Sequence, residues 1–147
     1  MGREVRKVPA NWCHPVEAEV LTHGRHEGQW MPTRWRPLLD CERLKYLEPG
    51  EAYDPNDYMP CWLPEDCTHL QMYETCSEGT PISPVMETPE ELARWLFNNK
   101  ASAWGSEKAT YEEWLATIKA GWAPSGVVQG GRCMSGVAAA LENSEDQ

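Results

Sequence analysis

The stretch from His69 to Leu96, "HLQMYETCSEGTPISPVMETPEELARWL", changes character twice and predicts the centre of the fold. Its first residues alternate Leu70 and Met72 with polar neighbours, which is typical of a half-buried strand ending near Thr75. Thr88-Pro89-Glu90-Glu91 then matches a capping box with proline at the first helical position. It predicts an amphipathic helix whose apolar face carries Leu92, Trp95 and Leu96.

A second amphipathic helix follows the first. Thr110-Tyr111-Glu112-Glu113 repeats the helix-start pattern, and Gly121 fits a left-handed C-cap. The apolar residues of this segment recur at the spacing of one helix face: Tyr111, Trp114, Leu115 and Ile118. Further on, Gly130-Gly131 predicts a tight turn between two short strands.

These elements predict an α+β fold in which a small antiparallel sheet packs against two C-terminal amphipathic helices. The sheet contains His69–Thr75, and Val127–Met134 can extend it. We expect one globular domain over residues 1–141, with a loop-rich N-terminal half and a flexible acidic tail over 142–147. Prolines and glycines interrupt about the first 35 residues, which predicts an irregular arm or short strands there. Pro37 favours a short helix that ends near Leu47.

Charge is distributed unevenly along this chain, whose net charge is −10. Residues 48–91 hold eleven Asp and Glu and no Lys or Arg. Contacts with a nucleic acid backbone need Lys and Arg to displace counterions, so this composition argues against direct nucleic acid binding. A protein partner with a basic surface is the better expectation.

Aromatic residues lie among the acids of the loop between Tyr53 and Asp66. Aromatic anchors surrounded by charges are typical of protein interfaces, because the rings bury apolar area and the charges steer association. The alternative interpretation is a solvated acidic face without a partner. We name these residues the acidic aromatic surface: Tyr53, Asp54, Asp57, Tyr58, Trp62, Glu65 and Asp66.

The loop between the predicted strand and the first helix is a second candidate site. It offers hydroxyl groups, a glycine that allows close backbone approach, and two stiffening prolines. Such a loop can bind an anion or a small ligand through backbone N–H groups. A plain connection between strand and helix explains the same residues. The candidate ligand-binding residues are Ser77, Gly79, Thr80 and Ser83.

We predict no metal, cofactor or catalytic site. The six cysteines are irregularly spaced, and Cys61-x5-Cys67-x-His69 departs from the paired short spacings of zinc sites. Cys67 and His69 can share a strand face, but a thiol nucleophile also needs a lowered pKa and an orienting group. The N-terminal residues contain no apolar run, which predicts neither a signal peptide nor a membrane span. We therefore expect a cytoplasmic protein whose thiols are reduced.

Two stretches, "GREVRKVPANW" at the start and "YMPCWLPEDCTHLQMYETCSEGTPISPVMETPEELARWL" from Tyr58, resemble small accessory proteins that bacteriophages and prophages encode. The resemblance covers the opening residues and most of Tyr58–Trp122, and it brings no established activity. The similar proteins tend to carry an acid or another residue where Cys13 and Cys61 stand here, which weakens any metal site that uses those thiols. What the resemblance implies is a phage setting, where small acidic proteins often inhibit bacterial defence systems.

The leading functional hypothesis is a non-enzymatic, phage-encoded inhibitor of a bacterial antiviral defence system, for example an anti-CRISPR protein. It would act in the host cytoplasm by binding a basic surface of a host defence protein through the acidic aromatic surface. One alternative is a small-molecule binder that sequesters a nucleotide immune signal. A phage enzyme or structural accessory protein is another. Self-association is also open.

Overall fold

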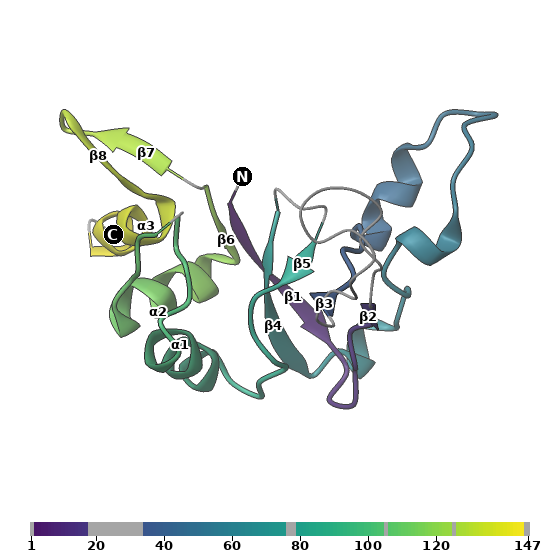
Figure 1. The fold of residues 1–147 in the computed structure, drawn as a ribbon, viewed down its shortest axis with the longest axis horizontal. Helices are drawn as coiled ribbons and strands as arrows, with labels where there is room; N and C mark the ends of the chain where they lie inside the picture. Colours follow the sequence, from purple (N-terminus) through teal and green to yellow (C-terminus); the bar gives the residue numbers. More distant parts are fainter. Residues whose placement is uncertain (1, 18–33, 76–78, 105, 125, 146–147) are drawn as a thin grey trace, which may run out of the picture.

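The computed structural model describes residues 2–17, 34–75, 79–104, 106–124 and 126–145. Its centre is a four-stranded antiparallel sheet in the order β5-β4-β1-β6, formed by β5 (Thr80–Pro81), β4 (His69–Glu74), β1 (Arg3–Val8) and β6 (Trp122–Ala123). Helices α1 (Pro89–Asn98), α2 (Tyr111–Ala120) and α3 (Gly136–Glu145) lie on one side of this sheet (Figure 1). The segment from 38 to 66 lies on the other side. The α+β class and the C-terminal helices agree with the sequence prediction.

Strand β1 is longer and more central than the sequence prediction implies. An irregular arm or short strands are expected over about 1–35, and Arg3–Val8 pairs along its whole length with β4, from Arg3 opposite Glu74 to Val8 opposite His69. The strand is difficult to recognise because Arg3, Arg6 and other charged residues interrupt its apolar positions. Arg3 and Arg6 have hydrogen-bond partners inside the fold, so the strand is not amphipathic in the usual sense.

Strand β4 is confirmed, but it is buried on both faces rather than half-buried. Met72 and Leu70 pack against the helices, whereas Tyr73 belongs to a second core on the opposite face. Gln71, Met72 and Tyr73 are all nearly inaccessible to solvent. The polar groups of Gln71 and Tyr73 can be buried because they hydrogen-bond to each other, over 2.9 Å.

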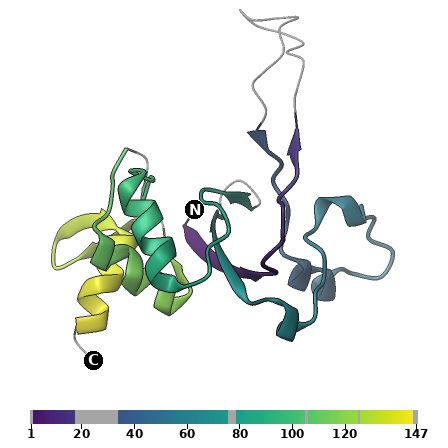
Figure 2. The same ribbon diagram turned by 90° about the horizontal axis from the view of Figure 1, so that it is seen from below.

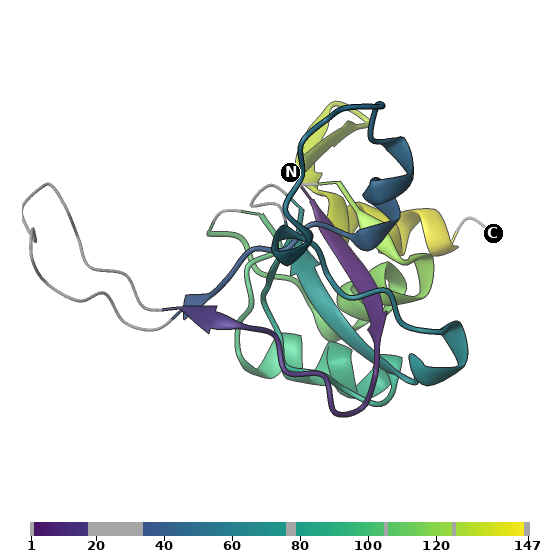
Figure 3. The ribbon, with the colours of Figure 1, turned by 90° about the vertical axis from the view of Figure 1, so that its right-hand side faces the viewer.

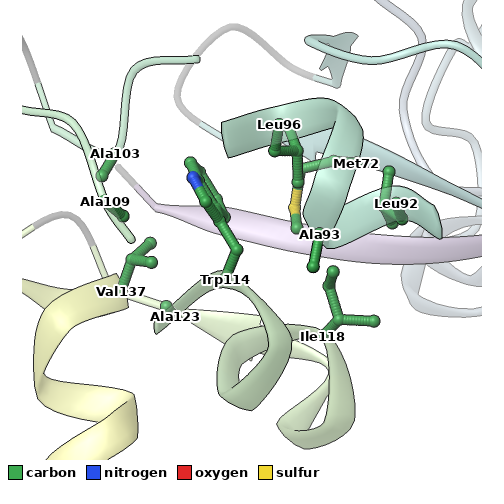
Figure 4. Packing of buried hydrophobic residues seen from close by; sticks show 10 residues of the cluster. All are labelled: Met72, Leu92, Ala93, Leu96, Ala103, Ala109, Trp114, Ile118, Ala123 and Val137. Atoms are coloured by element: carbon green, nitrogen blue, oxygen red, sulfur yellow. The ribbon is translucent and has the colours of Figure 1, made fainter. Parts of the chain in front are cut away.

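The core between the sheet and the helices is centred on Trp114, as Figure 4 shows. Its partners include Met72 from β4, Leu92 and Leu96 from α1, and Val137 from α3. Trp114 lies on the predicted apolar face of α2, and this face points into the core. Among the described residues its indole Nε1 is the one buried side-chain nitrogen or oxygen without a hydrogen-bond partner.

Both predicted helix starts are present. Thr110 and Glu113 form a complete capping box, and α2 ends at Gly121, whose φ of 94° is left-handed. Thr88 caps α1 by accepting a hydrogen bond from the Glu91 N–H, with Pro89 at the first position. Each terminal donor satisfied in this way removes an unpaired backbone group from the helix end.

The C-terminal region differs from the prediction in two ways. The hairpin of β7 (Gly126–Gln129) and β8 (Arg132–Ser135) forms a separate two-stranded sheet and does not extend the central one. Its turn at Gly130 and Gly131 has positive φ at both residues, as predicted. Residues 142–145, expected in a flexible tail, belong to helix α3. This helix begins at Gly136, where a side chain would overlap the backbone of Pro124.

The loop-rich half contains single helical turns and one short ribbon. The helix expected from Pro37 is a 3-10 helix, η1 (Cys41–Tyr46), that begins later because Asp40 caps it. Two further turns are η2 (Pro55–Asp57) and η3 (Pro64–Asp66), and β2 (Val16–Glu17) pairs with β3 (Arg34–Trp35). Figure 2 shows this half and the helical half on opposite sides of the central sheet.

Candidate functional site

The turn η2 positions the first part of the acidic aromatic surface. The Asp54 carboxylate accepts a hydrogen bond from the Asn56 N–H over 2.9 Å, and Pro55 presets the backbone of the turn. Tyr53 and Tyr58 flank this turn, and their rings meet edge to face with centroids 6.0 Å apart. Tyr53 remains 52% exposed. The turn therefore brings together a four-residue group: Tyr53, Asp54, Asp57 and Tyr58.

This turn is attached to the fold through backbone hydrogen bonds. The Leu39 N–H donates to the Asp57 carbonyl, and the Met59 N–H donates to the Leu39 carbonyl, each over 2.8 Å. Met59 then enters the second core with Val8, Leu38 and Tyr73. The aromatic rings above are thus held by a packed base, which reduces the entropy that binding would cost. Figure 3 views this side of the molecule directly.

A depression of about 480 Å³ lies beside the turn. Aromatic and proline rings form much of its wall, together with the side chains of Arg36 and Asn56. The ring-bearing residues are Trp12, Pro15, Tyr53, Pro55, Tyr58 and Pro60. Stiff rings form a surface on which an apolar group can pack without ordering flexible side chains.

The remaining predicted residues lie beside a different depression or on η3. Trp62 packs edge to face on Trp12, with ring centroids 4.8 Å apart, and it lines a neighbouring depression of about 300 Å³. Glu65 and Asp66 are exposed on η3 and line neither depression. The surface is therefore two adjacent groups rather than one, and Met59 and Pro60 line both depressions.

The acidic charge of this surface is smaller than the sequence count implies. Asp57 forms a salt bridge with Arg36, with 2.8 Å between Oδ1 and Nη2, and the two side chains are partly exposed. The sequence patterns did not identify Arg36 as part of this surface, because Arg36 lies outside residues 48–91, the segment without Lys or Arg. Glu87, Glu90 and Glu91 lie at the start of α1, on the helical side of the sheet. The acids of 48–91 therefore do not form one continuous patch.

A buried polar network lies beneath the surface, and sequence reasoning did not identify it. The Tyr73 hydroxyl accepts from Trp12 Nε1 over 3.3 Å and lies 3.0 Å from His14 Nδ1 and 2.9 Å from Gln71 Oε1. His14 Nε2 contacts the carbonyl of Arg36, which can only accept, so this nitrogen carries the hydrogen. Burial lowers the pKa of His14 and raises the pKa of Tyr73 to about 12, so both are neutral at neutral pH.

Arg6 connects this network to the loop-rich half. Its guanidinium lies 4.3 Å from the centre of the Tyr73 ring and forms a salt bridge with Glu4 over 2.7 Å. It also donates to the Leu38 carbonyl over 2.9 Å. The network links β1, β4 and the segment that precedes η1. We therefore interpret it as structural support for the surface above.

The second predicted site, in the loop after β4, is built largely into the fold. Ser83 is fully buried, and its hydroxyl accepts from the Met72 N–H and donates to the Pro84 carbonyl, each over 2.9 Å. The Gly79 carbonyl accepts from the Leu38 N–H, and its φ of 100° requires glycine. Thr80 pairs with Glu74 in the sheet, and Ser77 lies outside the described residues. The described polar groups therefore connect β4, β5 and the loop near Leu38.

Two of the described cysteines, Cys41 and Cys67, have a pKa shifted away from that of an activated thiol. Burial raises the pKa of Cys67, and burial with the neighbouring Cys61 thiol raises the pKa of Cys41 to about 12. A nucleophilic thiol needs the opposite shift. His69 bonds to the Thr68 hydroxyl over 2.9 Å. Within the described ranges, no three His, Cys, Asp or Glu residues are arranged to hold a metal ion.

No protein-family model, curated protein or solved structure matches this chain. Among the helices of the described segments, none combines the length and the apolar character that crossing a bilayer requires.

Proposed function

We propose that this protein binds a basic surface of another protein through the acidic aromatic surface and acts without catalysing a reaction. The observation that carries the proposal is the arrangement of Tyr53, Tyr58 and Trp62 among carboxylates on a base that is packed against the sheet. Aromatic anchors held in place by a packed base, with charges around them, are the usual features of an interface hot spot. Leu63, an exposed apolar residue next to Trp62 in the chain, extends the area that a partner would cover.

The partner that we propose is a host defence protein with a basic groove, such as a nucleic-acid-binding effector of a CRISPR system. Carboxylates can occupy positions where such a groove binds phosphates, and the Lys and Arg residues of the groove then contact the inhibitor. Asp54, Glu65 and Asp66 are exposed carboxylates of this surface. The phage setting comes from the resemblance of two stretches, at residues 2–12 and 58–96, to phage-encoded accessory proteins.

The test compares two variants that lose the same amount of charge on opposite sides of the sheet. The first carries Asp54→Asn, Asp57→Asn, Glu65→Gln and Asp66→Asn, and Asn at position 54 keeps the cap of η2. The matched control carries Glu87→Gln, Glu90→Gln, Glu107→Gln and Glu112→Gln, which are exposed acids of the helical half. Each tagged protein is expressed in an infected bacterial host, and the co-purifying proteins are identified by mass spectrometry.

We expect the wild type and the control variant to capture the same host protein, and the first variant to bind it about tenfold more weakly with a smaller dependence on salt. Efficiency of phage plating on a host with an active defence system then reports inhibition. Equal capture by both variants would overturn the proposal. Capture that depends on the acidic aromatic surface without any effect on plating would keep the binding function and reject the inhibition of defence.

A further inference from the structure

We propose that the depression between Trp12, Tyr53 and Tyr58 binds an extended, proline-containing segment that carries a basic residue. This inference rests on the proposed function, because it specifies which part of a basic protein the acidic aromatic surface recognises. The occupant is defined by its chemistry: proline rings for the walls of the depression, backbone carbonyls for the donors along it, and a Lys or Arg side chain for the carboxylates of η2.

The walls of the depression suit proline. Six of its lining residues carry rings, and the Tyr53 and Tyr58 rings meet edge to face, so that one ring presents its face where the other presents its edge. A proline ring is compact and rigid, and it packs against aromatic faces without losing rotamer freedom. Three of the wall residues are themselves prolines, Pro15, Pro55 and Pro60, so the groove also loses little conformational freedom on binding.

The donors of the depression suit an extended backbone. A polyproline II segment has no internal hydrogen bonds, and its carbonyl groups are free to accept from a partner. Within the described segments, the hydroxyls of Tyr53 and Tyr58 have no hydrogen-bond partner, although both residues line the depression. The Asn56 side chain lines it as well. These groups can donate hydrogen bonds to the carbonyls of an extended segment. The interior carbonyls of a helix are already hydrogen-bonded within the helix, so a helix would not accept from these groups in the same way.

The carboxylates of η2 select a basic side chain. Asp54 and Asp57 flank Pro55 and Asn56, which line the depression. One Asp54 oxygen accepts from the Asn56 N–H, and the exposed carboxylate has a second oxygen with which to accept. Asp57 is paired with Arg36, which also lines the depression, so the fold already places one guanidinium beside this carboxylate. A Lys or Arg of the bound segment would contact Asp54 and compete with Arg36 for Asp57.

The first experiment separates the contribution of proline from that of charge. Fluorescein-labelled peptides built from repeats of Arg-Pro-Pro, Arg-Ala-Ala or Gln-Pro-Pro are titrated with the full chain, and binding is followed by fluorescence anisotropy. We expect the Arg-Pro-Pro peptide to bind most tightly and each of the others about tenfold more weakly. Equal binding of Arg-Pro-Pro and Arg-Ala-Ala would overturn the inference, and so would no binding of Arg-Pro-Pro.

The second experiment assigns the two contributions to residues. Tyr53→Ser is expected to weaken both proline-containing peptides about tenfold, whereas Tyr46→Ser, which removes an exposed tyrosine outside the depression, changes nothing. Asp54→Asn keeps the cap and is expected to weaken only the peptides that contain arginine, and Glu112→Gln, at an exposed acid of the helical half, is its matched control. Unchanged thermal unfolding shows that each variant is folded. If Tyr53→Ser does not fold, Tyr53→Phe replaces it; this variant keeps the ring and loses only the hydroxyl donor. Loss of binding in the control variants instead would overturn the inference.

Failure of this inference differs from failure of the proposed function. If host-protein capture depends on the four acids while proline-containing peptides fail to bind, the partner presents another basic structure and only the inference is wrong. If the Arg-Pro-Pro peptide binds as described but no host protein is captured through these acids, the groove selects such peptides and the proposed function is wrong.

Discussion

The Tyr73 side chain joins the two halves of the protein. It is fully buried between the sheet and the loop-rich half, its ring contacts the Arg6 guanidinium, and its hydroxyl meets Trp12, His14 and Gln71. A buried hydroxyl is tolerated only when it is hydrogen-bonded, and here its single hydrogen serves either His14 Nδ1 or Gln71 Oε1. The local sequence predicts only an ordinary strand residue at Tyr73, because the partners of Tyr73 come mostly from segments far away in the chain.

Tyr73→Phe removes only this hydroxyl, and we expect it to lower the free energy of unfolding by about 1–3 kcal/mol, because the buried groups of Trp12, His14 and Gln71 lose their partner. Urea unfolding followed by tryptophan fluorescence measures the change. Tyr46→Phe, at an 81% exposed position, is the matched control and should leave the stability unchanged. If Tyr73→Phe is as stable as the wild type, the network does not support the fold.

At the scale of secondary structure, the helix starts illustrate how short sequence patterns encode local structure. Thr110 and Glu113 satisfy each other's backbone N–H groups, as the pattern predicts. In α1 the same pattern forms only one of the two bonds: Thr88 accepts from Glu91, but the Glu91 carboxylate accepts from the Glu87 N–H. The pattern therefore predicts where a helix begins more reliably than which partner the third residue takes.

Thr110→Ala is expected to destabilise the protein by about 1 kcal/mol, whereas Thr110→Ser, which keeps a hydroxyl acceptor, is expected to be nearly neutral. The loss reaches the whole fold because α2 carries Trp114 and Ile118 into the core. Thermal and urea unfolding of the two variants, compared with the wild type, test this. Equal stability of all three proteins would show that the capping box of α2 contributes nothing measurable.

At the scale of the whole molecule, the central sheet is covered on both faces by different kinds of structure. Helices pack on one face, and on the other the loop-rich half packs through Leu38 and Met59 and through the bonds of Arg6 and His14. His14 contributes because it contacts both Tyr73 and the carbonyl of Arg36. The docking of this half therefore depends in part on a buried histidine whose pKa is lowered by burial.

We expect the protein to lose stability as the pH falls below about 6.5. Burial depresses the pKa of His14 in the folded state, so below its ordinary value of 6.5 the unfolded chain binds a proton that the folded chain does not. The stabilisation is complete above that value and is lost as the pH falls toward the folded-state pKa. Urea unfolding between about pH 7.5 and pH 5, above the range of most carboxylates, measures the slope.

His14→Gln removes the titrating ring and should make this slope smaller, even if the variant is less stable throughout. A slope that is the same in wild type and variant would contradict the assignment to His14. The binding of the Arg-Pro-Pro peptide can be followed over the same pH range, which reports whether the surface above the network depends on the docking of the loop-rich half.

About half of the surface could be predicted from sequence. Tyr53, Asp54, Asp57 and Tyr58 are close together in the chain, and one capped turn is enough to gather them. Trp62, Glu65 and Asp66 were expected with them, but the chain passes through the second core at Met59 and separates the two groups. Arg36 and Trp12 complete the depression from segments that no local pattern connects with it.

Local signals in the sequence determined β4, the starts of α1 and α2, the end of α2 at Gly121 and the turn at Gly130-Gly131, because caps, left-handed glycines and periodicity act over a few residues. The tertiary structure decided the rest: the central position of β1, the separate β7-β8 hairpin, and the burial of both faces of the sheet. A pattern of apolar residues shows which side of an element is buried, but not what covers it. Polar residues such as Arg6, His14 and Gln71 become interior residues only when distant segments supply the hydrogen bonds that offset the loss of water.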